Sequence, residues 1–111
     1  MKKLIRALKW FRTLDQNISV NSVLVFLYAM NKELYPTQRD IEKKLGASNA
    51  ATSRNVSYWL AYKKGTTPGH GLLNRTPDIM DRRAQVLNLT PKGTSFSNQF
   101  ELFGGLNGTS T

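Results

Sequence analysis

Residues 48–64, SNAATSRNVSYWLAYKK, contain many hydrogen-bond donors and three cations but no Asp or Glu. Ser48 can cap the first free amide groups of a helix, so the small polar residues at the start predict a helix over this stretch. Amide, hydroxyl and guanidinium groups without a carboxylate among them are suited to the phosphates and base edges of nucleic acid. The imbalance of charge therefore indicates a helix that lies on nucleic acid; the alternative is an ordinary amphipathic surface helix.

The two faces of this helix differ in chemistry. Val56, Trp59 and Leu60 have the spacing of a buried helical face. Thr52 and Ser53 belong to its small polar beginning. The predicted outer face has groups that donate to phosphates or base edges: Asn49, Arg54, Asn55, Tyr58 and Tyr62.

The charge of the whole chain points to the same kind of partner. The 111 residues include 16 Lys and Arg against seven Asp and Glu, which gives a net charge of +9 and a pI near 10.2. Such a charge on a small chain favours a polyanionic partner, although a basic surface can also serve solubility alone. The length predicts one domain, residues 1–105, followed by a disordered tail, 106–111.

Few residues support catalysis or metal binding. The chain has no cysteine, which excludes disulfides and thiolate metal sites, and its one histidine, His70, lies in a glycine-rich loop. The carboxylates are scattered, and the loop GTTPGHG at 65–71 lacks the Gly-Lys-Ser/Thr ending of a P-loop. We therefore predict that the protein is not an enzyme and holds no metal or cofactor.

No membrane or export segment is predicted. Arg6, Lys9 and Arg12 interrupt any apolar run near the start, and the most apolar segment, residues 20–30, is too short to cross a bilayer. We expect a soluble cytoplasmic protein without a membrane partner.

Two helices are predicted before residue 34. Leu4, Leu8 and Phe11 form a helical stripe within residues 1–14, and the other face has five cations and no acid. A basic amphipathic helix can touch a membrane surface or a partner. We expect this one to pack on the domain or to form half of a dimer interface. Residues 18–33 leave little polar face, which predicts the central helix.

Residues 37–46 predict the first half of a helix-turn-helix. Thr37 is a good N-cap, Asp40 follows three positions later as in a capping box, and Gly46 ends the helix 38–45. A tight turn then leads into the polar helix at Ser48. A short helix, a glycine turn and a polar-fronted second helix are typical of DNA-binding units, although such pairs also occur in proteins that bind nothing.

A hairpin and a last helix are predicted to follow. The glycine-rich loop is interpreted as a spacer, 72–75 and 84–90 as strands, 76–78 as a turn and 79–83 as the tip. Thr90 and Pro91 are suited to begin a helix that ends at Gly104-Gly105. Its apolar residues recur at helical spacing: Phe96, Phe100 and Phe103.

This order predicts an α+β, mostly α, fold: a winged helix-turn-helix with a two- to three-stranded wing and N- and C-terminal helices. From about residue 37 to 93 the chain resembles the MarR family of winged-helix transcription factors. The match is most specific in the wing, where Arg75, the pair Asp81 and Arg83, and the ending LTPKG at 89–93 have the family's spacing. The triplet Thr52-Ser53-Arg54 matches the polar triplet of the family's recognition helix.

Two features depart from the family's pattern. The segment from Leu60 to Gly71 is longer than usual, which indicates either an extended recognition helix or a bulged loop. The family dimerises through long terminal helices, whereas this chain ends soon after Phe103, so its dimer is expected to be smaller, different or absent. Because the family senses ligands near that interface, no small-molecule effector is assigned.

The resemblance implies that helix 48–64 reads the major groove and that the wing, 75–90, enters the minor groove. Asp81 is expected to orient Arg83 for insertion; the alternative is a solvated turn pair. Residues of helix 38–45 are expected to contact phosphates and so position the protein. The predicted DNA-binding residues are Thr37, Gln38, Arg39, Lys43, Ser48, Asn49, Thr52, Ser53, Arg54, Asn55, Tyr58, Arg75, Asp81, Arg82 and Arg83.

The sequence thus predicts a sequence-specific regulator that binds double-stranded DNA as a homodimer. We expect a repressor that occupies a promoter, and the small size fits a version that a phage or mobile element encodes. The alternative is a winged-helix docking module in a transcription or replication assembly, with its basic face turned to an acidic partner.

Overall fold

The computed structural model describes residues 2–30, 36–64, 67–77, 80 and 84–104, with 62–64, 67 and 100–104 described by their backbone alone. The elements of this part are α1 (Lys2–Arg12), α2 (Val20–Met30), α3 (Gln38–Leu45), α4 (Asn49–Ser57), β1 (Tyr62–Lys64), β2 (Thr67–Pro68), β3 (Leu73–Pro77), β4 (Gln85–Leu89) and α5 (Pro91–Gly104). Their order confirms the predicted α+β, mostly helical, winged-helix class. The predicted tail at 106–111 lies outside the described residues.

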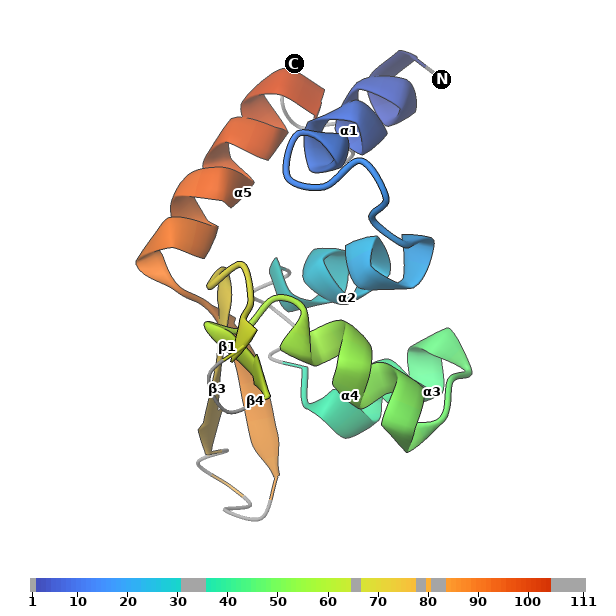
Figure 1. Cartoon of the computed structure of the whole chain (residues 1–111), viewed down its shortest axis with the longest axis vertical. Helices are drawn as coiled ribbons and strands as arrows, with labels where there is room; N and C mark the ends of the chain where they lie inside the picture. The colour runs from blue at the N-terminus through green and yellow to red at the C-terminus, as the bar shows by residue number, and fades with distance from the viewer. Residues whose placement is uncertain (1, 31–35, 65–66, 78–79, 81–83, 105–111) are drawn as a thin grey trace.

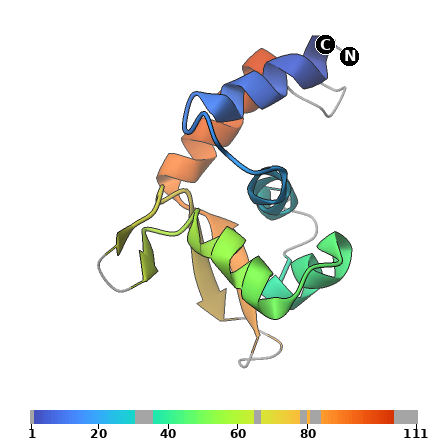
Figure 2. The ribbon, with the colours of Figure 1, turned by 45° about the vertical axis from the view of Figure 1, so that its right-hand side comes forward.

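The helices form two groups at opposite ends of the molecule. α1 and α5 pack against each other at the end where both termini lie, while α3, α4 and the β3–β4 hairpin lie towards the other end (Figure 1). α2 contacts α3, α4 and β4, and a turned view shows it between the two groups (Figure 2). The helix pair and the hairpin are therefore supported from one side by α2.

Aromatic rings join the two groups in one core. The ring of Phe26, which is completely buried, lies 4.9 Å from that of Trp59 and 5.5 Å from that of Phe96, centroid to centroid. Phe11 of α1 lies 5.8 Å from Phe26. Each such pair contributes about 0.5–1.5 kcal/mol beyond its buried apolar area. The indole Nε1 of Trp59 also donates a 2.7 Å hydrogen bond to the carbonyl oxygen of Ser22, which fixes the end of α4 to α2.

Helix α1 packs on the domain through part of the predicted apolar stripe. Its buried residues are Ala7 and Phe11, and Trp10 stacks on Phe96 of α5 with centroids 5.4 Å apart. A small residue at position 7 lets the two helices approach closely. Of the predicted stripe, Phe11 is thus buried in the single chain, while Leu4 and Leu8 remain exposed. Three apolar side chains that flank the packed face are 42–48% exposed: Leu4, Ile5 and Leu8.

Helix α2 begins at an N-cap, because Ser19 Oγ accepts a hydrogen bond of 3.1 Å from the amide of Ser22. Most of its face is buried around Phe26, as predicted for the central helix. Val20 is an exception at 72% exposure, since the first position of the helix lies beyond the packed elements. Residues 31–33 of the predicted helix lie outside the described part.

Helix α4 is shorter than the predicted helix over 48–64, and that prediction is wrong in its second half. The carbonyl oxygens of residues 58–61 accept hydrogen bonds of 2.8–3.2 Å from the amides of residues 69–73. A longer helix would need those carbonyls for its own amides four residues later. Gly69 permits the close approach, because a Cβ there would lie 2.1 Å from the carbonyl oxygen of Leu60.

The chain between α4 and β3 forms a small antiparallel hairpin, β1–β2. Tyr62 is paired with Pro68, and Lys64 with Thr67. The interpretation of 65–71 as a plain spacer is therefore wrong in part, because Thr67 and Pro68 belong to a strand. Of the two alternatives for the long connection, the structure has the bulged one.

The β3–β4 hairpin is the predicted wing. The two strands stay in register along their whole length, and β3 continues through Thr76 and Pro77, where a turn was predicted. Thr37 forms a β-bridge with Val86, and the amide of Leu87 donates a 2.9 Å hydrogen bond to the carbonyl of Pro36. These contacts join the wing to the start of α3.

Helix α5 begins at the predicted cap. Thr90 Oγ1 accepts a 2.9 Å hydrogen bond from the amide of Gly93 and donates a 2.8 Å bond to the carbonyl of Gly71. Phe96 packs into the aromatic core as expected. The other two apolar positions of this helix have side chains outside the described part: Phe100 and Phe103.

Candidate nucleic-acid interface

The start of α3 is fixed by the predicted capping box. The Thr37 amide donates to the Asp40 carboxylate at 2.9 Å, and the Asp40 amide donates to Thr37 Oγ1 at 3.1 Å. The first of these bonds lowers the pKa of Asp40, assisted by Lys43 and Lys44 and opposed by partial burial. This carboxylate is therefore committed to the cap, and three cations of α3 are exposed around it: Arg39, Lys43 and Lys44.

The open face of α4 consists of small residues and one arginine. Ser48 caps the helix by accepting a 3.1 Å hydrogen bond from the amide of Ala51. Buried Val56 and Trp59 hold the opposite face on the core, as predicted. Five of the exposed or half-exposed positions follow helical spacing and form one face: Asn49, Ala50, Ser53, Arg54 and Ser57. None is acidic, and the small side chains leave room for another surface to approach the backbone.

Three predicted contact residues do not belong to this open face. Thr52 is completely buried. Asn55 Oδ1 accepts a 3.2 Å hydrogen bond from Ser22 Oγ of α2. Tyr58 donates a 2.7 Å hydrogen bond from its hydroxyl to the carboxylate of Asp15. The outer-face prediction is therefore wrong for Asn55 and Tyr58, because α2 and the loop after α1 cover that side of α4. The predicted DNA contact of Thr52 is ruled out by its burial.

The environment of Tyr58 has a measurable consequence. Burial first, and then the hydrogen bond to Asp15 and its charge, raise the pKa of Tyr58. Its ring also lies 4.7 Å from that of His70, centroid to centroid. Tyr58 is thus part of the packing between the end of α4, the loop after α1 and the glycine-rich segment.

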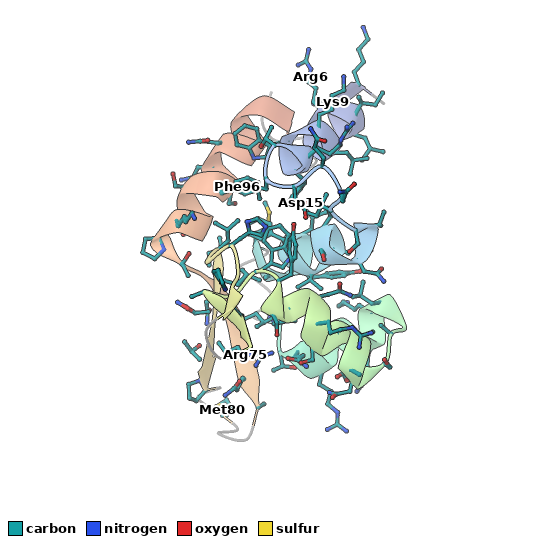
Figure 3. All side chains as sticks on the ribbon, viewed as in Figure 1. Arg6, Lys9, Asp15, Arg75, Met80 and Phe96 are labelled. Atoms are coloured by element: carbon teal, nitrogen blue, oxygen red, sulfur yellow. The ribbon has the colours of Figure 1, made fainter. Side chains whose placement is uncertain are left out.

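A groove of about 740 Å³ lies between α3, the start of α4 and the wing. Figure 3 shows Arg75 of the wing between the hairpin and the helix pair. The groove brings five predicted residues together: Thr37, Gln38, Arg39, Asn49 and Arg75. It also contains three that the sequence analysis missed: Glu42, Ala84 and Gln85. Glu42 could have been found, because it follows Gln38 by one helical turn.

Arg75 and Gln38 orient each other in this groove. Arg75 Nη2 donates a 2.9 Å hydrogen bond to Gln38 Oε1. Because a guanidinium only donates, the amide of Gln38 must turn its oxygen towards Arg75 and keep its NH2 group for another acceptor. A phosphate oxygen is an acceptor of this kind. Nε of Arg75 is buried and has no hydrogen-bond partner among the described residues.

Asn49 is oriented in the same way by Glu42. Its Nδ2 donates a hydrogen bond to Glu42 Oε1 across the turn between α3 and α4. The groove therefore contains two side-chain amides whose orientation is set by a charged neighbour.

The wing extends beyond this groove. Met80 is 91% exposed and lies at the far end of the hairpin (Figure 3). In the stem, Asn88 Nδ2 donates a 2.6 Å hydrogen bond to Thr76 Oγ1. Asp81, Arg82 and Arg83 lie outside the described residues, so their roles and the Asp81–Arg83 pair stay predictions.

Two other kinds of site are not found in the part of the chain that the structure describes. It contains no group of three or more His, Asp or Glu side chains that could hold a metal ion. None of its helices is both long enough and apolar enough to cross a bilayer.

Two helices joined by a glycine turn, with a hairpin tied to the first and lying beside the second, define the chain as a winged helix-turn-helix protein. Its fold is that of the MarR-type regulators. It matches wild-type E. coli MarR in its apo form with a TM-score of 0.64 and 20% identity, over 96% of this chain and 70% of that one. It matches a cysteine-to-serine mutant of E. coli MarR, complexed with operator DNA, with a TM-score of 0.63 and 20% identity, over 94% and 66%.

A glycine-to-lysine mutant of S. aureus MepR matches with a TM-score of 0.62 and 22% identity, over 83% of this chain and 63% of MepR. The chain therefore spans less than two thirds of the length of some of the proteins it matches. No family model matches the sequence, and no curated protein matches it. The MarR-like fold is thus established by structure rather than by overall sequence similarity.

Proposed function

We propose that the protein is a sequence-specific regulator that binds double-stranded DNA, with α4 in the major groove and the β3–β4 wing in the adjacent minor groove. The observation that carries this proposal is the open face of α4. It presents Asn49, Ser53 and Arg54 without an acid, while Val56 and Trp59 hold the other face on the core. A helix with an exposed donor face of this size fits the major groove.

The groove beside α4 supports the same proposal. Arg39 and Lys43 are exposed on α3, and Gln38 keeps its NH2 group free for a phosphate. Contacts of this kind position a protein on the duplex without reading its sequence. Arg75, half-buried at the root of the wing, fixes the wing relative to α3.

We further propose a homodimer that represses by occupying its promoter. The exposed apolar side chains of α1, Leu4, Ile5 and Leu8, lie at the end of the molecule opposite α4. A two-fold contact there would leave both recognition helices free, with half-sites about 34 Å apart, one turn of DNA.

Selection of bound sequences from a random duplex pool tests the proposal. We expect an enriched motif whose two-fold symmetry reports the dimer. Salt should weaken binding of the selected duplex. With about six to ten phosphate contacts, the affinity should fall by a factor of about 10³–10⁵ between 50 and 200 mM salt. Weak binding of all sequences alike would instead favour the docking module as the function.

A further inference from the structure

Glu42 and Asn49 form a pair that simple charge complementarity does not explain. Glu42 is the single acid among the described residues that line the groove. A negative charge there repels the phosphates that Arg39 and Lys43 are placed to attract. The carboxylate has a specific partner, however, because it accepts a hydrogen bond from Asn49 Nδ2.

The chemistry of this bond fixes the direction of the Asn49 amide. An ionised carboxylate only accepts hydrogen bonds, whereas an asparagine amide has a donating and an accepting end. Asn49 must therefore turn its NH2 group to Glu42, which leaves Oδ1 on the other side of the amide group. Asn49 is exposed and is the first residue of α4, the part of a recognition helix that reaches base edges.

We propose that Glu42 orients Asn49 as a hydrogen-bond acceptor that recognises the exocyclic amino group of adenine or cytosine in the major groove. The inference rests on the proposed function and names one of its determinants. Adenine N6 and cytosine N4 donate in that groove, whereas guanine O6 and thymine O4 accept and would face Oδ1 unfavourably. Asn49 is the reading residue, and Glu42 is a positioning residue that acts through it.

The test uses duplexes carrying the motif that the wild-type protein selects. The contacted base pair is the one at which Asn49→Ala loses its preference. Four duplexes that differ only there are then titrated with wild type, Glu42→Ala and Glu42→Gln. Wild type should bind duplexes with adenine or cytosine on the contacted strand about tenfold more tightly than those with guanine or thymine.

The two Glu42 variants separate orientation from charge, because both remove one negative charge. Each should bind all four duplexes more tightly than wild type does. In Glu42→Ala the amide of Asn49 is free to turn, so the preference should fall to about twofold. In Glu42→Gln the side chain keeps an acceptor oxygen for Asn49, so most of the tenfold preference should remain.

Each possible outcome is decisive. A preference that is unchanged in Glu42→Ala would overturn the inference, since Glu42 would then act as a charge alone. Equal loss in both variants would also contradict it, because the acceptor oxygen would not matter. Glu42 is half-exposed in the middle of α3, and a thermal melt of Glu42→Gln checks that the fold is kept. A wild-type protein that selects no motif would contradict the proposed function itself, which is a different result.

Discussion

Arg54 is the longest side chain on the open face of α4, and its neighbours there are small. In the proposed complex, Ala50 and Ser53 would let the helix approach a base edge closely enough for the guanidinium to reach a guanine or a phosphate. Its place on the open face follows from the buried residues Thr52 and Val56, which fix the rotation of the helix. The reading role of Arg54 is therefore testable by substitution alone.

Replacing Arg54 with Ala should cost about 1–3 kcal/mol of affinity for the selected duplex and relax the preference at one base pair. Arg54→Lys keeps the charge but loses the planar fork, so it should restore non-specific affinity and not the preference. Titration of the two variants against selected and substituted duplexes measures both effects. A preference that Arg54→Ala leaves intact would exclude a reading role.

Tyr58 shows the opposite case, a polar residue that belongs to the packing. Tyr58→Phe should lower the free energy of unfolding by about 1–2 kcal/mol near pH 8, because the bond to Asp15 is lost. The folded state raises the pKa of Tyr58 above its ordinary value of about 10. The stabilisation is thus complete below that value and is lost as the pH rises above it.

Denaturant unfolding of wild type and Tyr58→Phe between about pH 8 and 11, on both sides of the ordinary tyrosine pKa, measures this effect. The stability of wild type should fall towards that of the variant at high pH, while DNA affinity per folded molecule stays equal. If Tyr58→Phe has the stability of wild type but binds DNA weakly, Tyr58 belongs to the DNA-binding face of α4 and not to the packing.

At the scale of elements, beginnings of helices could be predicted and the end of α4 could not. The caps at Thr37, Ser48 and Thr90 depend on hydrogen bonds over three residues, so local sequence shows them. α4 ends because amides of residues 69–73 take the carbonyls of 58–61, a contact set by the return of the chain. No periodicity in the sequence reports such a contact.

Gly69 tests this explanation of the end of α4. Gly69→Ala should lower the free energy of unfolding by about 1–3 kcal/mol, because the new Cβ meets the backbone of Leu60. Gly46→Ala is the control. The φ of Gly46 is +63°, but a Cβ added there would meet no other part of the structure within 4 Å. Only the cost of the left-handed conformation, about 1 kcal/mol, is therefore expected. Denaturant unfolding that ranks Gly69→Ala as the milder change would contradict the account.

The site shows the same limit on prediction. Three groove residues on α3 and β3, Gln38, Arg39 and Arg75, could be named from the sequence, because the capping box and the wing motif place them. The cover over one polar side of α4 could not, since Ser22 and Asp15, polar partners from distant elements, hold Asn55 and Tyr58 there. Helical spacing alone gives the faces of a helix and leaves open what covers each face.

At the scale of the molecule, the exposed apolar residues of α1 and helix α4 lie at opposite ends. In Figure 3, Arg6 and Lys9 extend from α1 at the end opposite Met80. The apolar residues beside these cations, Leu4, Ile5 and Leu8, are about half exposed in the single chain. This arrangement supports the proposal that the end with α1 pairs with a second copy of the chain and the end with α4 binds DNA.

Leu8→Glu should therefore convert a homodimer into a monomer, because it places a charge in the apolar contact. Val20→Glu is the matched control: Val20 is 72% exposed and apolar but lies on α2, so its substitution should leave the dimer intact. Light scattering at tens of micromolar protein measures both. Wild type that is monomeric there, with and without its DNA site, would refute the dimer.

If this fold reads a DNA sequence, as we propose, its affinity for DNA depends on the order of the bases. The most direct measurement is the ratio of affinities for the selected duplex and for a duplex of the same length and composition with its bases shuffled, both at physiological salt. A specific regulator should bind the selected duplex about 10³-fold or more tightly. Equal affinities would mean that the charge of the protein, and not the face of α4, accounts for its binding, and the proposed function would be wrong.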